Sequence, residues 1–475
     1  MMIIDDVALL SLPQHSASCL DRFRTGLYSC LTRRGDALFE LTDAVACGQS
    51  PVRDLAHLSL EVEHRRGHGA LYDAMGAGRI DEQQLRQLII RGPVPTIACP
   101  GGKKRIVLAV DVSNWLRPDA ATSPDRSFCH TYARGRGQAQ MIPGWQYSFV
   151  CALEAGASSW TALLDVSRLR PGDDATAMTA GQVRTVIESL ERAGHVRAGD
   201  PDVLIVLDAG YDVARLAWLL DDLPVTLIGR LRSDRVFHAP AGTRHGPTKG
   251  RAPRHGAKLV LADAATHPEP TRATDNETGR YGHAEAQAFA RMHPKIDSRG
   301  GWKDHAGQLP IIEGTVVGLR VERLPGDREP KPVWLWASKP VPESDAEIDH
   351  WWSMFIRRFD LEHTFRFLKQ TLGWTKPRLR HTAAADRWTW IIIAAHTQLR
   401  LARALTIDYR LPWQRPLAPT MLTPARVRAG YRRICATAAR PASEPKGTRP
   451  GPGRPKGRRN RRKAPTQPVG KQSTG

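Results

Sequence analysis

The sequence has few of the features that mark membrane, secreted or zinc-binding proteins. Only seven cysteines are spread over the 475 residues, and none of them forms a CxxC pair. This pattern argues against a cysteine-based zinc site and predicts a reduced, cytoplasmic protein. The most apolar stretch, residues 388–405, is interrupted by His396, Arg400 and Arg403, so no membrane span is expected. The amino-terminal residues lack the basic region of a secretory signal, and none is expected.

Familiar catalytic motifs and negative charge are also scarce. The sequence contains no GxSxG, HExxH or phosphate-loop motif, which argues against those hydrolase and nucleotide-binding classes. Asp and Glu number 48 against 69 Lys and Arg, giving a net charge of +21. Such an excess favours an anionic polymer, most commonly nucleic acid, as the partner. An arginine bias from a GC-rich genome would give the same excess, so the position of the charges matters more.

The hydrophobic pattern divides the chain into segments. Residues 1–98 predict a helical amino-terminal domain, and residues 99–104 form a turn-rich linker. Residues 104–234 then alternate between buried-strand and helical patterns, which predicts an α/β fold with a mixed sheet. The strands are expected at residues 106–112, 147–153, 160–169, 203–207 and 225–231, and the helices at 174–193 and 213–220.

The second half begins with a different composition. Residues 235–340 are rich in Gly, Pro, His and Arg and predict a β-rich insertion with long loops and strands at 315–322 and 333–337. Helices are expected again in residues 341–405, at 351–372 and 382–405, and in the segment 406–440, at 424–439. Residues 441–475 carry ten Lys and Arg against one Glu, and this basic tail is predicted to be disordered.

Two aspartates end the most apolar predicted strands. Asp111 follows residues 106–110, and Asp208 follows residues 203–207. A carboxylate in such a place costs several kcal/mol unless it is paired, hydrogen-bonded or bound to a metal. The carboxyl ends of neighbouring strands are where α/β folds bind ligands. Either aspartate alone could be a helix cap, so a joint site and two separate structural roles both remain open.

A third group of polar residues lies in the helix predicted over residues 351–372. Phe355, Arg358, Glu362 and Lys369 are spaced so that they share one face of a continuous helix. Glu362 then lies between two cations. A solvated amphipathic face with local ion pairs would have the same pattern.

At this point the sequence resembles a known family. Phe355-x2-Arg358-x3-Glu362-x6-Lys369 is similar to the Tyr-x2-Arg-x3-Glu-x6-Lys (YREK) signature of DDE transposases from bacterial insertion sequences. All four positions match in spacing and three match in residue type. Asp111 and Asp208 take the places of that family's two aspartates. Phe355 departs from the signature because it lacks the tyrosine hydroxyl, and any phosphate contact by that hydroxyl is absent here.

The resemblance implies an RNase H-like catalytic core of the retroviral-integrase superfamily, interrupted by the β-rich insertion. It implies a catalytic and metal-binding triad of Asp111, Asp208 and Glu362, which would hold two Mg²⁺ ions, or Mn²⁺, through oxygen ligands. Arg358 and Lys369 would then bind DNA phosphates beside them. The expected reaction is metal-dependent nicking at the ends of an insertion sequence, followed by strand transfer into target DNA.

The partners implied are double-stranded DNA and, when two ends are joined, a second copy of the chain. Helical residues 1–98 would recognise the element ends, and the protein would be cytoplasmic and associated with the nucleoid. Two alternatives remain open: a DNA-binding descendant of a transposase without activity, and another RNase H-like nuclease.

Other candidates carry weaker signals. Asp212 is predicted to be a helix N-cap rather than a metal ligand. Asp165 is expected to be structural, and Asp360 to point away from the face of Glu362. Trp302 could stack on a flipped base, although packing within its own loop is the simpler interpretation.

The basic tail contains a motif of its own. Residues 452–459 resemble an AT-hook, whose Gly-Arg-Pro core lies in the narrow minor groove. This resemblance makes Arg454, Lys456, Arg458 and Arg459 candidate DNA-binding residues. An unstructured basic tail without sequence preference is the alternative, and its binding to DNA would also depend on salt.

Overall fold

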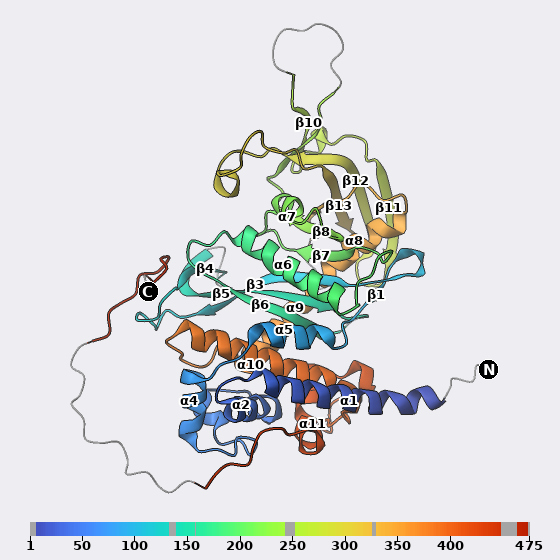
Figure 1. Cartoon of the computed structure of the whole chain (residues 1–475). Coiled ribbons are helices and arrows are strands. Elements are labelled where there is room, and N and C mark those ends of the chain that lie inside the picture. Colours follow the sequence, from blue (N-terminus) through green and yellow to red (C-terminus); the bar gives the residue numbers. More distant parts are fainter. Residues whose placement is uncertain are drawn as a thin grey trace.

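The computed structural model describes residues 6–132, 139–156, 158–242, 252–324, 329–447 and 463–473. Its centre is a mixed sheet of twelve strands that has helices on both faces (Figure 1). A layer of helices from both ends of the chain lies beneath this sheet in the view of Figure 1. The architecture is therefore α/β, as the strand and helix patterns predict.

Five strands in the order β6–β5–β3–β7–β8 form the centre of the sheet. The strands β3, β5 and β6 are antiparallel, whereas β7 and β8 run parallel to β3. This mixed order is consistent with the RNase H-like core that the resemblance implies. The five strands are β3 (Val107–Leu116), β5 (Ala139–Leu153), β6 (Thr161–Leu169), β7 (Val203–Leu207) and β8 (Val225–Leu231).

The strand positions predicted from apolar runs are confirmed at β3, β6, β7 and β8. The helices α6 (Ala175–Arg192) and α7 (Val213–Leu219) also form where they are expected. The strand β4 (Ser127–Tyr132), which pairs with the first half of β5, was not predicted. Its sequence mixes polar and apolar residues, and its stability comes from pairing rather than from burial on both faces.

The inserted segment extends the central sheet instead of forming a sheet of its own. The strand β14 pairs antiparallel with β8, and the order continues through β13, β12, β9 and β10. The predicted strands at 315–322 and 333–337 form, while the other four were missed. The six strands are β9 (Val236–Pro240), β10 (His255–Val260), β11 (Arg272–Thr278), β12 (Gly282–Pro294), β13 (Gly314–Val321) and β14 (Val333–Ala337).

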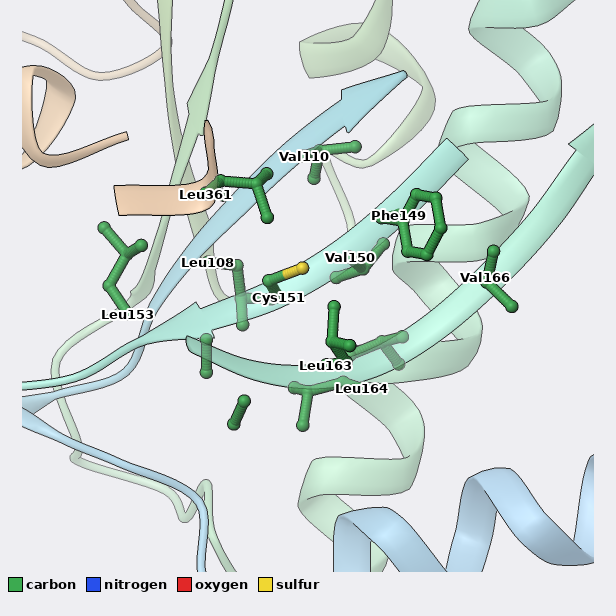
Figure 2. Packing of buried hydrophobic residues seen from close by; sticks show 14 of the residues in the cluster. Leu108, Val110, Phe149, Val150, Cys151, Leu153, Leu163, Leu164, Val166 and Leu361 are labelled. Carbon is green, nitrogen blue, oxygen red and sulfur yellow. The ribbon is translucent and has the colours of Figure 1, made fainter. Parts of the chain in front are cut away.

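Apolar side chains alternate across the central strands and fill both faces of the sheet. Figure 2 shows residues of β3, β5 and β6 in this core, together with Leu361 from the helix that covers one face. Val110, Phe149 and Leu361 are fully buried. Burial of such side chains stabilises the fold by about 1.5–3 kcal/mol each. This packing holds the central strands rigidly, and with them the polar residues at their ends.

The single helix predicted over residues 351–372 is two helices. The first, α8 (Asp345–Arg357), ends before Arg358, and α9 (Asp360–Gln370) begins two residues later. Between them the amides of Arg358, Phe359 and Leu361 bond to carbonyls three residues back rather than four. Both junction residues keep right-handed helical angles. A tight turn of this kind preserves the apolar spacing, so the sequence pattern conceals it.

Helices from the two ends of the chain pack together in one layer. Arg24 of α1 forms an ion pair with Asp43 of α2 and donates to Gln398 of α10, and Tyr431 of α11 donates to the same Gln398. The first ninety residues therefore share a core with the carboxyl-terminal helices. The layer contains α1 (Asp6–Cys30), α2 (Gly35–Cys47), α3 (Leu55–Leu58), α4 (His68–Ala77), α5 (Glu82–Arg91), α10 (Thr382–Leu401) and α11 (Pro424–Thr437). A two-stranded pair, β1 (Ile97–Ala98) and β2 (Lys104–Arg105), follows α5.

The described parts of the basic tail, residues 441–447 and 463–473, contact the folded chain. The amide of Ser443 donates to Asp36, and the amides of Gln467 and Gly470 donate to carbonyls of residues 121 and 126. Composition cannot reveal such main-chain contacts. Within the described ranges, no helix combines the length and apolarity needed to cross a membrane.

Candidate active site

The two aspartates that end apolar strands lie side by side. Val110 of β3 pairs in parallel register with Leu207 of β7. Asp111 and Asp208, which follow these two residues, therefore lie at the same level. Asp111 is also the cross-strand partner of Phe149 on β5, and paired residues of antiparallel strands point to the same face. Since the Phe149 ring lies 5.2 Å from that of Phe365, this face is the one covered by α9.

Arg358 bridges the two carboxylates. Its Nη1 lies 2.7 Å from Oδ2 of Asp111, and its Nη2 lies 3.6 Å from Oδ2 of Asp208. The tight turn between α8 and α9 carries this arginine to the sheet, 247 residues away from Asp111 in sequence. The side chain of Asp111 is 16% exposed and that of Asp208 is 39% exposed. The pair is therefore reachable from solvent along one side.

Burial and neighbouring acids raise the pKa of Asp111 to about 6. Burial is the largest cause, and the charges of Glu362 and Asp208 act in the same direction. Arg358 and the amide of Val112, which donates to Oδ1 of Asp111 over 2.8 Å, oppose the shift. The charges of Asp208 and Glu362 thus both disfavour the ionised form of Asp111.

The remaining signature residues lie on α8 and α9. Glu362 is exposed in the first turn of α9. Lys369 in its last turn lies over the Trp374 ring, with Nζ 5.7 Å from the ring centroid. Burial lowers the pKa of Lys369, while Glu362 and Asp111 oppose this shift. Phe355 is 9% exposed and belongs to the hydrophobic core.

The carboxylate oxygens of this site have the chemistry that a divalent cation requires. Asp208 Oδ1 is buried and has no hydrogen-bond partner among the described residues, and all ligands on offer are the oxygens that Mg²⁺ and Mn²⁺ prefer. Over the same ranges, no three Asp, Glu, His or Cys side chains are grouped closely enough to hold a metal ion. The two aspartates therefore match a cation in ligand chemistry and strand register, whereas no third carboxylate of the described residues is grouped with them. Arg358 supplies the positive charge between them in this conformation.

Three other acidic residues have structural roles. Asp212 accepts from a backbone amide three residues later and caps α7, which confirms the prediction of an N-cap. Asp165 is buried in an ion pair with Arg86 of α5, as a structural role requires. Asp360 pairs with Arg357 at 2.8 Å.

Trp302 packs within its own part of the fold. Its side chain is 8% exposed, and its ring centroid lies 6.3 Å from Trp218 and 5.6 Å from His305. Trp302 thus packs against His305 of its own loop and against Trp218 of α7, and this burial favours a packing role over stacking on a flipped base. The candidate tail residues Arg454, Lys456, Arg458 and Arg459 lie outside the described residues.

Tyr211 is a site residue that the sequence analysis missed. It follows Asp208 by three residues in the turn before α7, and burial raises its pKa, with the charge of Asp111 acting in the same direction. The signal in the sequence was an aromatic residue immediately after Asp208-Ala-Gly. Such a position at the carboxyl end of a strand commonly lines a ligand site.

The comparison with known families agrees with this geometry. Residues 26–294 match the family described as DDE superfamily endonuclease. This range covers more than half of the chain and includes both Asp111 and Asp208, whereas Glu362 lies beyond it. No curated protein matches the chain.

Proposed function

This chain belongs to the DDE superfamily endonucleases, and on that basis we propose that it is a DNA transposase of the bacterial insertion-sequence type. The family implies nuclease or transposase activity on DNA. The proposed reaction begins with hydrolysis of a phosphodiester at the element end, which leaves a 3′-hydroxyl. That hydroxyl then displaces the 3′-oxygen leaving group of a target phosphodiester, so one phosphodiester forms as another breaks.

The observation that carries the proposal is the convergence of Asp111, Asp208 and Arg358. The two aspartates come from strands far apart in the sequence, and the arginine comes from the signature that resembles the YREK group. Maintaining two carboxylates beside each other at a partly buried position costs free energy. A site that binds a cation and a phosphate accounts for that cost.

Asp111 and Asp208 would hold Mg²⁺ or Mn²⁺, and Glu362 would complete the donor set for two ions. A divalent ion bound there supplies Lewis-acid polarisation of the scissile phosphate and lowers the pKa of the attacking hydroxyl group. The chain itself positions the carboxylates through the rigid packing of β3 and β7. In this structure Arg358 supplies the positive charge between the two carboxylates.

The cationic residues would hold the DNA. Arg358 offers a planar fork that can bind a phosphate through two hydrogen bonds, and Lys369 offers a compact charge at the far end of α9. Phe355 has no hydroxyl and is buried, so we assign it the packing role that keeps α8 against the sheet. Its contribution to DNA binding would be indirect.

Finer features of the proposal concern other segments. We assign recognition of the element ends to the amino-terminal helices, whose exposed cations suit phosphate contacts. The basic tail would add affinity that depends strongly on salt. Joining two ends requires two active sites, so a homodimer is the expected assembly on DNA.

The test is strand cleavage of a labelled duplex that carries the element ends, in the presence of Mg²⁺. The intact protein would be compared with Asp111→Ala, Asp208→Ala and Glu362→Ala at concentrations that give equal DNA binding. The proposal expects cleavage by the intact protein and by none of the variants. Binding without any cleavage by the intact protein would instead favour a DNA-binding protein that has lost activity, and cleavage by one variant would remove that residue from the triad.

A further inference from the structure

A cavity lined by positive charge opens directly beside the carboxylate pair. It has a volume of about 600 Å³ and begins at Ala209, the residue after Asp208. Four cations line it, namely Arg230, Arg232, Arg320 and Lys331. Leu231, His267 and Trp334 contribute part of the remaining wall, and none of the described residues that line it is acidic. The volume falls within the range of known ligand sites.

The strand register places these cations along the same edge of the sheet as the aspartates. Leu207 pairs with Gly229 in parallel register, so Arg230, the next residue of β8, lies at the same level as Asp208. Arg232 lies just beyond β8, and Arg320 lies near the carboxyl end of β13. Lys331 precedes β14, which runs antiparallel to β8. The edge therefore changes from acidic at β3 and β7 to basic at β8, β13 and β14.

The four cations differ from most charged residues near the site because they have no internal partners. Within the described ranges, none of their side chains forms an ion pair or a hydrogen bond. All four are exposed. Four like charges around one cavity repel one another, although Glu285 lies opposite Arg320 on the neighbouring strand β12. A phosphate-rich ligand would relieve it and would release the counterions that the cations hold.

We propose that this cavity binds the phosphodiester backbone of the DNA strand that extends from the carboxylate pair. The inference rests on the proposed function, since it takes the scissile phosphate to lie at Asp111 and Asp208. Arg230 contacts the phosphates nearest that point, and Arg320 and Lys331 contact phosphates further along. The cavity fixes the path of the strand across β8 and β14 and thereby positions the scissile phosphate.

The experiment uses the full chain and a labelled DNA duplex of arbitrary sequence. Backbone contacts do not depend on sequence, so knowledge of the element ends is not needed. The double variants Arg230→Gln/Arg320→Gln and Arg232→Gln/Lys331→Gln are compared with Arg192→Gln/Arg197→Gln. The control pair is exposed and removes the same charge. It lies at the carboxyl end of α6 and in the segment after it, near the amino end of β7 and therefore at the opposite edge of the sheet. Circular dichroism and thermal unfolding confirm that each variant is folded.

The measured quantity is the slope of log K against log salt concentration for duplex binding. Each cavity variant is expected to reduce its magnitude by about 1.8, since each lost phosphate contact contributes about 0.9. The control pair is expected to leave it unchanged. Equal slopes for the cavity variants, the control and the intact protein would overturn the inference, even if the intact protein cleaves DNA.

A competition arm separates DNA from a free phosphate ligand. Pyrophosphate at the same phosphate concentration should displace little DNA from the intact protein, because it makes fewer simultaneous contacts. In one outcome, the cavity variants lose pyrophosphate binding but bind DNA as the intact protein does. This would assign the cavity to a small phosphate ligand and overturn the inference. The intact protein could also fail to cleave DNA while the cavity variants still reduce the salt slope. This would support DNA binding by the cavity and refute only the transposase activity.

Discussion

Two clusters of close charges in this molecule are built in opposite ways. In the helical layer, Arg24 and Asp43 are 0% and 3% exposed, and two hydrogen bonds of 2.7 and 2.9 Å join both carboxylate oxygens to the guanidinium. At the edge of the sheet, Arg358 is shared between two aspartates at unequal distances, and Asp208 Oδ1 has no partner among the described residues. In the first cluster both carboxylate oxygens have a hydrogen-bond partner, whereas in the second one carboxylate oxygen has none among the described residues.

This difference separates charges that stabilise the fold from charges that act on a ligand. Removing one member of a fully paired buried cluster destabilises the folded protein strongly. An incompletely paired cluster contributes less to folding, and its members are free to bind a cation or a phosphate. Substitutions in the two clusters should therefore affect different measurements.

The largest effect is expected from Asp208→Asn at the sheet edge. We expect DNA cleavage in Mg²⁺ to fall by about a thousandfold or more, since a lost metal ligand removes several kcal/mol of transition-state stabilisation. The thermal midpoint should stay close to that of the intact protein. Gel-based nicking rates and differential scanning calorimetry measure the two effects. A large loss of stability would show that the sheet-edge cluster is structural after all.

The next effect concerns the paired cluster. Asp43→Asn leaves the buried Arg24 without its counter-charge and should lower the free energy of unfolding by about 3–5 kcal/mol. Urea unfolding measures this loss. Asp222→Asn is the matched control, because the acid of its ion pair with Arg184 is 63% exposed, and an exposed pair contributes little to stability. Equal losses for both variants would remove the distinction between the clusters.

A third prediction concerns acid stability. Burial lowers the pKa of His396 to about 3, and neither ring nitrogen has a partner among the described residues. Below the ordinary pKa of 6.5 the unfolded chain binds a proton that the folded chain does not, so this histidine destabilises the fold as the pH falls from 6.5 to about 3. The slope should reach up to about 1.4 kcal/mol per pH unit. It should be smaller in His396→Leu, as measured by urea unfolding at several pH values.

The smallest effect is expected at the cap of α7. Asp212→Ala removes the bond from the carboxylate to the amide of Arg215 and should lower the unfolding free energy by about 1 kcal/mol. Asp212→Asn retains a capping oxygen and should behave like the intact protein. If Asp212→Asn abolished cleavage while remaining fully folded, Asp212 would belong with the sheet-edge cluster.

The sequence predicted the parts of this fold that depend on local burial. The strands β3, β7 and β8 are continuous apolar runs, so their positions and the aspartates at their ends could be read directly. The strands β9 to β12 could not, because many of their residues are exposed and their stability comes from pairing with distant segments. The break before α9 was missed because a single tight turn leaves the spacing of apolar residues nearly unchanged.

The site shows the same division. The position of Asp111 beside Asp208 follows from the parallel order of two strands, which a sequence pattern can suggest. The ion pair between Arg358 and Asp111 depends on how the turn before α9 meets the sheet, and no local pattern encodes that contact. The cavity cations were missed for a related reason, since they come from β8, β13 and the approach to β14.

The central claim is that Asp111 and Asp208 together hold a divalent cation, and Mn²⁺ binding measured by isothermal titration calorimetry tests it most directly. The intact protein, Asp111→Asn, Asp208→Asn and the cap control Asp212→Asn would be titrated under the same conditions. The account predicts saturable binding to the intact protein and the control, and loss of that binding in both site variants. Equal binding of Mn²⁺ by all four proteins would contradict it.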